Sequence, residues 1–279
     1  MDRKLIFLDI DGTLTEGGSN TPPASAQKAV KAARKKGHLV YLCTGRNYDM
    51  LSPLLAYGFD GVVGSSGGYI KCGEQVIYDC PMTREQQDRA LGVLRKNGIF
   101  CTIEGKGGSY TDDGFKQFLA EKARADGNSE LLRWREQIEK ALNIRPIREY
   151  QGEPIYKIVL MCEHEEQLAE PRKVLQEDFN FCIQDIDDRG IINGELVNKH
   201  FDKGRGMERV CSFLGIDMKD TIAFGDSMND LEMIETAGLG ICMENGSREL
   251  KKLADEICPA AADDGLKKAF EKHGLIQQE

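Results

Sequence analysis

Short apolar runs and amphipathic segments alternate along the first third of the chain. The apolar runs cover residues 4–10, 38–43 and 60–64, and their lengths suit buried strands. Between them, residues 22–36 and 46–57 carry apolar side chains at helical spacing, and each segment stops before a glycine. The order strand–helix–strand–helix–strand predicts a parallel sheet with right-handed crossovers.

The pattern changes over the middle of the chain and later returns. After a hairpin expected over residues 69–78, strands (99–104, 155–162, 180–185) are mixed with helices (84–97, 117–124, 130–142, 165–177). Strands (221–224, 239–243) and helices (204–214, 228–236, 247–254, 265–273) then alternate again. We therefore expect an α/β core domain built from residues 1–81 and 198–279, with an α+β domain inserted at residues 82–197.

Composition and charge narrow the class of protein. The 279 residues are 41% hydrophobic and 30% charged, which is typical of a soluble globular chain. No apolar run approaches the roughly 18 residues of a membrane span, and the first residues lack a secretory pattern. We expect a cytoplasmic protein with no membrane partner. A net charge of −9 disfavours a nucleic-acid partner.

Cysteine usage points to the same compartment. The nine cysteines include no Cys-x-x-Cys pair, and most lie inside apolar runs. This pattern favours small core residues in a reducing compartment over a disulfide framework or a zinc site. The four histidines are scattered, and we expect surface or loop positions for them.

The first chemical feature is a pair of acids at the end of the first predicted strand. Asp9 and Asp11 flank Ile10 and precede Gly12, where the chain turns. Residues two apart on a strand point to the same side, and two neighbouring carboxylates are costly to bury unless a cation joins them. Mg²⁺ is the natural partner of such oxygens. One acid could then attack phosphorus while the other manages the proton; a plain surface turn is the alternative.

Three further segments share this context. Asp226 follows a predicted strand, and Asn229 and Asp230 lie just beyond it, where they could orient Asp226 or a metal-bound water. Thr44, in Thr-Gly-Arg, ends the second predicted strand. Lys203 precedes a predicted helix and could neutralise a phosphate. Each segment alone also suits an ordinary turn or cap. Because the carboxyl ends of parallel strands meet at one crevice, we expect them to converge.

Together these motifs resemble the haloacid dehalogenase superfamily of phosphatases. Their order, residue types and spacing match over residues 9–44 and 203–230, and the insertion resembles the C2-type cap of the Cof-like branch. The resemblance implies a Rossmann-like, three-layer core with a parallel sheet, and an inserted cap domain. It also implies a Mg²⁺-dependent phosphatase that hydrolyses a small phosphorylated metabolite, such as a sugar phosphate.

The resemblance assigns roles residue by residue. Asp9 is the expected nucleophile that forms an aspartyl-phosphate, and Asp11 the acid that protonates the leaving oxygen and then activates water. The expected Mg²⁺ ligands are Asp9, the Asp11 backbone carbonyl and Asp226, with Asp230 in support. The expected substrate-binding and phosphate-binding residues are Gly12, Thr44, Gly45, Arg46, Ser66, Lys203 and Asn229.

The chemistry sets two requirements on this assignment. At 4 Å, two unit charges at an effective dielectric of about 20 repel by roughly 4 kcal/mol, so the approach of an ionised Asp9 to a phosphate needs Mg²⁺ and Lys203. Asp11 must carry a proton for the first step, which burial near other acids could achieve.

One segment departs from the family pattern. Cof-like members often have Asn-Gly-Ala or Asn-Gly-Gly after the third strand, whereas this chain has Ser65-Ser66-Gly67-Gly68. Ser66, at the asparagine position, keeps a hydroxyl but lacks the paired donor and acceptor of an amide. The substrate of typical Cof-like members therefore cannot be assigned directly to this chain.

Two alternative functions stay open from the sequence. A sugar-phosphate mutase would pass the phosphoryl group to another hydroxyl instead of water, and product analysis separates it from a phosphatase. A non-catalytic module that binds a phosphorylated ligand would use the same fold without turnover. The oligomeric state is not readable from the chain.

Overall fold

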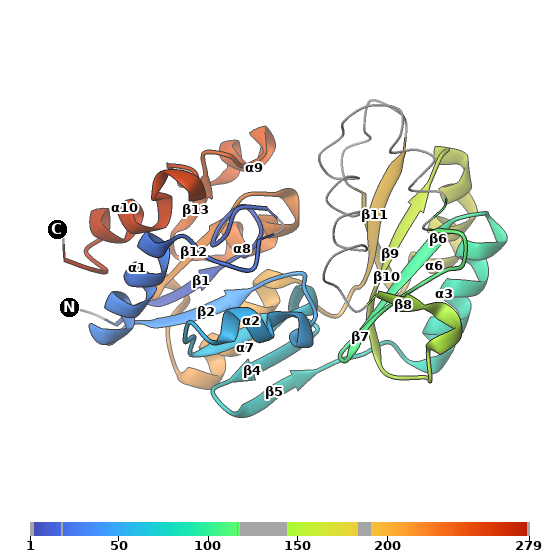
Figure 1. Cartoon of the computed structure of the whole chain (residues 1–279), viewed down its shortest axis with the longest axis horizontal. Helices are drawn as coiled ribbons and strands as arrows, with labels where there is room; N and C mark the ends of the chain where they lie inside the picture. Colours follow the sequence, from blue (N-terminus) through green and yellow to red (C-terminus); the bar gives the residue numbers. More distant parts are fainter. Residues whose placement is uncertain (1–2, 18, 116, 118–143, 184–190, 278–279) are drawn as a thin grey trace. The chain divides into compact units, whose positions relative to one another are not determined.

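The computed structural model of the chain describes residues 3–17, 19–115, 117, 144–183 and 191–277. The chain divides into two compact units, each with its own hydrophobic core (Figure 1). The first unit comprises Met1–Asp79 and Phe201–Glu279, and the second comprises Cys80–His200. The sequence analysis placed the two crossings at residues 81/82 and 197/198.

The first unit is built on an eight-stranded sheet. Its strands are β1 (Leu5–Leu8), β2 (Leu39–Cys43), β3 (Gly61–Gly64), β4 (Tyr69–Cys72), β5 (Gln75–Asp79), β12 (Thr221–Gly225), β13 (Gly240–Met243) and β14 (Glu256–Cys258). They lie in the order β14-β13-β12-β1-β2-β3-β4-β5. The strands from β14 to β3 pair in parallel, whereas β4 and β5 form an antiparallel hairpin at one edge. The predicted α/β class with a mainly parallel sheet is confirmed.

Helices cover both faces of this sheet. One layer contains α1 (Ala24–Lys35), α2 (Ser52–Leu55) and α10 (Gly265–Lys272), and the other contains α7 (Lys203–Leu214), α8 (Leu231–Thr236) and α9 (Arg248–Leu253). Successive residues of β1 point to opposite faces, so Ile6 packs in the first layer and Phe7 in the second. Because both faces are covered, β1 is apolar throughout.

The second unit has a six-stranded sheet in the order β10-β11-β9-β6-β7-β8. The strands are β6 (Phe100–Gly105), β7 (Gly108–Thr111), β8 (Ile144–Pro146), β9 (Ile155–Cys162), β10 (Phe179–Ile183) and β11 (Ile192–Asn198). Side chains of α3 (Arg84–Lys96) and α6 (Ala169–Leu175) pack with this sheet in a single core. The described pairs are antiparallel except for β7 and β8.

Several elements differ from the sequence expectations. The helix expected over residues 46–57 is a 3₁₀ turn, Tyr48–Leu51, followed by the short α2. The Asn47 side chain caps the turn by accepting from the Met50 N–H, and Pro53 lacks a backbone donor. The strands β7, β8, β11 and β14 were not predicted. Apart from Gln117, the helices expected over residues 117–124 and 130–142 lie outside the described residues.

The cysteines and the described helices bear on the compartment. All nine cysteines are free thiols, and seven of them are buried, as expected for small core residues. Within the described ranges, no helix is both long and apolar enough to cross a bilayer.

One histidine lies in a loop, as expected, but is buried. His38, just before β2, is only 5% exposed. Its Nδ1 accepts a hydrogen bond from the backbone N–H of Lys4 at 3.1 Å, so the neutral ring fits the site and a protonated ring does not. Burial lowers the pKa of His38, and the nearby charges of Lys36 and Lys4 lower it further.

This burial predicts a pH-dependent contribution to stability. The unfolded histidine, with a pKa of 6.5, takes up a proton at a higher pH than the buried ring does. We therefore expect His38 to destabilise the fold as the pH falls below about 6.5. His38→Asn keeps an acceptor for the Lys4 N–H and removes the titrating group. Denaturant unfolding from about pH 7.5 to about pH 5 should show a smaller loss of stability for the variant. Parallel profiles for the two proteins would contradict this account.

Candidate active site

Four loops of the first unit meet at the carboxyl edge of its sheet. The neighbouring strands β12, β1, β2 and β3 end there, followed by Asp226, Asp9, Thr44 and Ser65. Backbone hydrogen bonds join adjacent loops. The Asp9 N–H donates to the Phe224 carbonyl at 3.0 Å, and the Ser66 N–H donates to the Thr44 carbonyl at 3.0 Å. The parallel register thus places residues from distant parts of the chain at one edge.

Lys203 is the cation at the centre of this edge. It is the first residue of α7, and its side chain is 1% exposed. Its Nζ lies 2.7 Å from Asp9 Oδ1 and 2.5 Å from Asp230 Oδ1, and it contacts Asn229 Oδ1 at 3.3 Å. A buried ammonium group is stable only when such partners replace its water. Lys203 therefore fixes Asp9 against the end of β12.

Asp230 holds the Asp226 loop in place. Its carboxylate is fully buried, with Oδ1 on Lys203 and Oδ2 accepting from the backbone N–H groups of Asp226 and Ser227 at 2.9 and 3.1 Å. The Ser227 and Asp230 pair forms a capping box at the 3₁₀ turn Met228–Asp230. Both oxygens of Asp230 are thus already hydrogen-bonded, so it acts first as a scaffold.

Asp226 points across the crevice toward the β1 loop. The Thr13 hydroxyl donates to its Oδ1 at 3.4 Å. Gly12 lies directly beneath it, with a φ of +85°, and a Cβ at Gly12 would stand 2.3 Å from Asp226 Oδ2. Only glycine combines this left-handed backbone with the close approach of the carboxylate.

Acids outnumber cations in this cluster. Carboxylate oxygens of Asp9, Asp226 and Asp230 lie within 4.8 Å of one another. Three carboxylates against one ammonium group leave a charge of about −2 when all are ionised, which a divalent cation would neutralise. The donors are all oxygens, as hard divalent cations require. The cluster therefore fits a divalent ion in charge and in donor type.

The pKa values follow this excess of negative charge. Burial raises the pKa of Asp9 well above its usual range, and repulsion from Asp230 adds to the effect while Lys203 opposes it. Burial, followed by repulsion from Asp230, raises the pKa of Asp226 to about 7. Both carboxyls are therefore harder to ionise until a cation approaches them.

The second acid of the β1 loop is held apart from this cluster. Asp11 is paired with Arg46, whose Nε and Nη2 donate to its two oxygens at 2.8 and 2.7 Å. Both side chains are partly exposed, at 24% for Asp11 and 11% for Arg46. Asp11 is thus less buried than expected and pairs with a cation through a guanidinium fork, although its charge still helps to raise the pKa of Asp226.

The loop after β3 has an unusual backbone. Ser65 and Ser66 adopt φ values of +49° and +56°, and Gly67 follows at +100°. Left-handed residues other than glycine cost about 1–2 kcal/mol each. The loop is held by the contact of its Ser65 N–H with the Arg46 carbonyl at 2.9 Å. A Cβ at Gly67 would stand 2.2 Å from the Asp202 carbonyl, so the loop packs tightly on the start of α7.

The sequence-predicted residues thus fall into two sets. The structure brings together Asp9, Lys203, Asp226, Asn229 and Asp230 by direct or shared contacts. Asp11 and Arg46 form a separate pair, whereas Gly12, Thr44, Gly45 and Ser66 line the same loops. The sequence analysis expected Arg46 to bind the substrate phosphate and did not predict its direct contact with Asp11.

Sequence reasoning missed three supporting residues. Asn245 donates from Nδ2 to the Gly12 carbonyl at 2.8 Å, Thr13 contacts Asp226, and Asn20 contacts Arg46. Asn245 lies after β13, one strand further along the sheet. A search for polar residues just after every parallel strand would have found Asn245, but no pattern marks Asn20.

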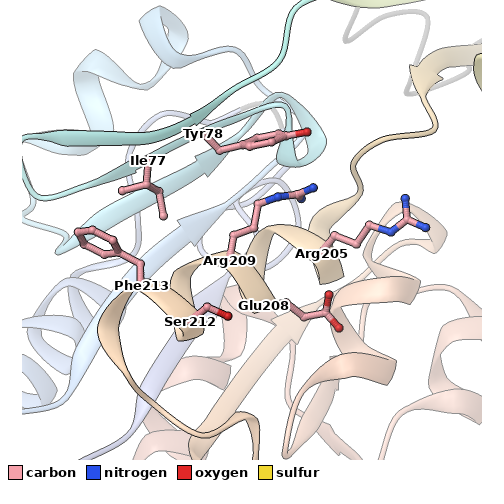
Figure 2. A pocket seen from close by; sticks show the side chains of 7 residues that line it. All are labelled: Ile77, Tyr78, Arg205, Glu208, Arg209, Ser212 and Phe213. Atoms are coloured by element: carbon pink, nitrogen blue, oxygen red, sulfur yellow. The ribbon is translucent and has the colours of Figure 1, made fainter.

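A described hollow of the first unit lies elsewhere. It has a volume of about 600 Å³ between β5 and α7 and is lined by Ile77, Tyr78, Arg205, Glu208, Arg209, Ser212 and Phe213 (Figure 2). Its cations are already engaged: Arg209 lies 3.9 Å above the Tyr78 ring, and Arg205 pairs with Asp202 at 3.3 Å. None of the sequence-predicted site residues lines it, so the acidic crevice is the better candidate for chemistry.

Comparisons with known proteins identify the family of the chain. Residues 6–270 match the family model of haloacid dehalogenase-like hydrolases. The chain is 29% identical over 279 residues to YkrA of Bacillus subtilis (strain 168), which is named as a candidate phosphatase, and the match covers 99% of this chain and all of YkrA. It is 27% identical to 5-amino-6-(5-phospho-D-ribitylamino)uracil phosphatase YwtE of the same organism, covering 94% of this chain and 95% of YwtE.

Solved structures show the same fold over the full length. A protein from Geobacillus kaustophilus HTA426 matches with a TM-score of 0.78 and 26% identity, covering 99% of this chain and 100% of that one. A subclass IIB sugar phosphatase of the superfamily matches with a TM-score of 0.77 and 23% identity, covering 98% and 100%.

The packing at Gly12 predicts a selective defect. Gly12→Ala puts a methyl group against Asp226, and we expect cation binding to weaken at least about tenfold because the carboxylate is displaced. Gly37→Ala is the matched control, because Gly37 has a similar φ of +94° and open space at its Cβ. Both variants should lose about 1–2 kcal/mol of stability from backbone strain. Calorimetric titration with magnesium chloride and denaturant unfolding measure the two effects. Equal cation binding in the two variants would show that the Asp226 contact is unimportant.

The raised pKa of Asp226 predicts a second pH effect, of opposite sign to that of His38. The folded, metal-free protein holds a proton on Asp226 up to about pH 7, whereas the unfolded chain releases it near its ordinary value of 3.8. Stability in chelator should therefore fall as the pH rises from about 4 through about 7, and magnesium chloride should restore it. Asp226→Asn should flatten both the pH dependence and the response to the cation. Thermal melts across this range provide the measurement, and an unchanged profile in the variant would refute the assignment.

Proposed function

The chain belongs to the haloacid dehalogenase-like hydrolases as a phosphatase of the Cof-like branch, and we propose that it hydrolyses a small phosphorylated metabolite with the help of Mg²⁺. The observation that carries the proposal is the buried contact of Lys203 with Asp9 inside a cluster of three acids. A carboxylate held next to a cation at the carboxyl edge of the sheet is suited to attack a phosphate. The relatives that match over the full length are named as phosphatases.

In this proposal Asp9 is the nucleophile. One of its oxygens, Oδ1, accepts from Lys203 at 2.7 Å, which fixes the orientation of the carboxylate. The other oxygen attacks phosphorus, the bond to the leaving oxygen breaks, and an aspartyl-phosphate forms on Asp9. Water then hydrolyses the intermediate, which returns the free carboxylate and releases phosphate.

The groups around Asp9 would offset the negative charge of the substrate phosphate. Asp9, Asp226 and the Asp11 carbonyl would hold Mg²⁺, with Asp230 in support, and the bound ion would offset the negative charge of the phosphoryl group. Lys203 adds a fixed positive charge at the same place. The side-chain hydroxyls of Thr44 and Ser66 and the backbone of Gly45 are the proposed phosphate and substrate contacts.

Asp11 is the proposed acid and base. It lies two residues beyond the proposed nucleophile, and in the absence of substrate Arg46 donates to both of its oxygens, at 2.8 and 2.7 Å. A substrate phosphate that attracts Arg46 would release Asp11 to carry the proton for the leaving oxygen. In this order of events Arg46 binds the substrate phosphate, whereas it stays bound to Asp11 when no substrate is present.

The second unit is the proposed cap. Its sheet, with α3 and α6 packed in its core, suits the α+β insertion expected of the C2 type. The sugar phosphatase and the ribitylaminouracil phosphatase among the matches support a small phosphorylated substrate with hydroxyl groups.

The proposed nucleophile can be tested directly. Wild type should release phosphate from a panel of phosphomonoesters in the presence of Mg²⁺, and Asp9→Asn should lower kcat by about 10³-fold or more because an amide does not attack phosphorus. Asp263→Asn, an exposed acid after β14, is the control and should retain full activity. Phosphate release is followed by a colorimetric assay with and without chelator.

The other outcomes separate the alternatives. Conversion of a sugar phosphate to an isomer without free phosphate would identify a mutase. Binding of phosphorylated ligands with no turnover of any compound would identify a non-catalytic module. Full activity of Asp9→Asn would refute the nucleophile assignment.

A further inference from the structure

Arg46 is held at both ends of its guanidinium. One edge of the group donates to the two oxygens of Asp11. The remaining nitrogen, Nη1, donates to Asn20 Oδ1 at 2.6 Å, and Nη2 also contacts the Ser19 carbonyl at 3.3 Å. The side chain of Arg46 is 11% exposed, so these contacts largely replace its water. The orientation of the fork is therefore set by Asn20 as well as by Asp11.

Asn20 and Asp11 belong to the same loop. The Gly12 N–H donates to the Thr15 carbonyl at 2.8 Å, and the Ser19 N–H donates to the Glu16 carbonyl at 3.0 Å, so the chain turns twice between them. The Ser19 hydroxyl accepts from the Thr21 N–H at 3.1 Å and fixes the backbone beside Asn20. The loop that begins with Asp11 thus returns to the guanidinium that binds Asp11.

A guanidinium with one bound edge can swing about its long side chain, whereas one with two bound edges has a single orientation. The Asp11 carboxylate follows the fork because both of its oxygens are bound to it. Loss of the Asn20 contact would leave the pair intact but free to move together. Misplacement of a catalytic group by about 1 Å can cost up to about 10²-fold in rate.

We propose that Asn20 is a positioning residue for the phosphatase reaction, which fixes the direction of the Asp11 carboxylate through Arg46. The inference rests on the proposed role of Asp11 as the acid that protonates the leaving oxygen. Asn20 does not touch the reacting atoms in this assignment. It contributes by holding the partner of the group that does.

The role predicts a dependence on the leaving group. An alkyl phosphate needs a proton on its leaving oxygen, whereas nitrophenyl phosphate leaves as a stable anion and needs it much less. Asn20→Ala should lower kcat for an alkyl phosphate about tenfold, with a smaller loss for nitrophenyl phosphate and little change in KM. A general disturbance of the fold would lower kcat for both substrates by the same factor.

Two matched variants sharpen the test. Asn20→Asp retains an oxygen acceptor for Arg46 and should keep the alkyl phosphate activity close to wild type. Glu16→Ala removes an exposed side chain of the same loop but keeps the backbone carbonyl that accepts from the Ser19 N–H, and it should leave the leaving-group dependence unchanged. Equal losses on the two substrates in Asn20→Ala, or a change in KM alone, would overturn the proposal.

A readout without turnover separates this inference from the proposed function. The Nη1–H signal of Arg46, assigned by its loss in Arg46→Lys, should exchange with solvent more rapidly in Asn20→Ala than in wild type, because its acceptor on Asn20 is removed. Faster exchange without any phosphatase activity would support the Asn20 contact while refuting the proposed function. Identical exchange in the two proteins would refute the contact, whatever the activity.

Discussion

The buried ammonium group of Lys203 is the interaction on which the site depends. Removing an ion from water costs several kcal/mol, and here that cost is offset by Asp9 and Asp230, at 2.7 and 2.5 Å. These contacts tie the start of α7 to the ends of β1 and β12, which are far apart in the chain. Asp230 extends the same connection to the backbone of Asp226. The ammonium group beside the proposed nucleophile, Asp9, therefore also holds the loops together.

The same arrangement leaves the crevice with an excess of acid. Asp9 and Asp226 are each raised in pKa by burial and by the charge of Asp230, so the metal-free cluster is electrostatically unfavourable. A site built in this way trades stability of the empty protein for affinity toward a divalent ion. Gly12 permits the close approach of Asp226, since any side chain there would occupy the place of the carboxylate. The acidic cluster can therefore form only because a glycine at this turn leaves space for the Asp226 carboxylate.

Asp11, the proposed acid and base, has a different cation as its partner. Asp11 faces Arg46 and not Lys203, and Arg46 is in turn bound by Asn20. Two neighbouring acids on one strand end therefore receive two different cations. Environments of this kind separate the behaviour of chemically identical carboxyls, which is what a nucleophile and an acid require. The loop from Asp11 to Asn20 provides the second environment.

The sequence alone determined the alternation of strands and helices that makes a mainly parallel sheet, the α/β class and most of the acids and cations of the crevice. These follow from apolar runs that end in polar residues, because a parallel sheet brings the ends of its strands to one edge. Tertiary structure decided which carboxylate pairs with which cation. Arg46 binds Asp11, Lys203 lies between Asp9 and Asp230, and Asn20 enters the network from a loop without any pattern. Such choices depend on side-chain directions and distances across the sheet edge, which local periodicity does not contain. The strand β11 escaped prediction for the same reason, because its alternating, glycine-containing sequence is stabilised by pairing with β9 and β10.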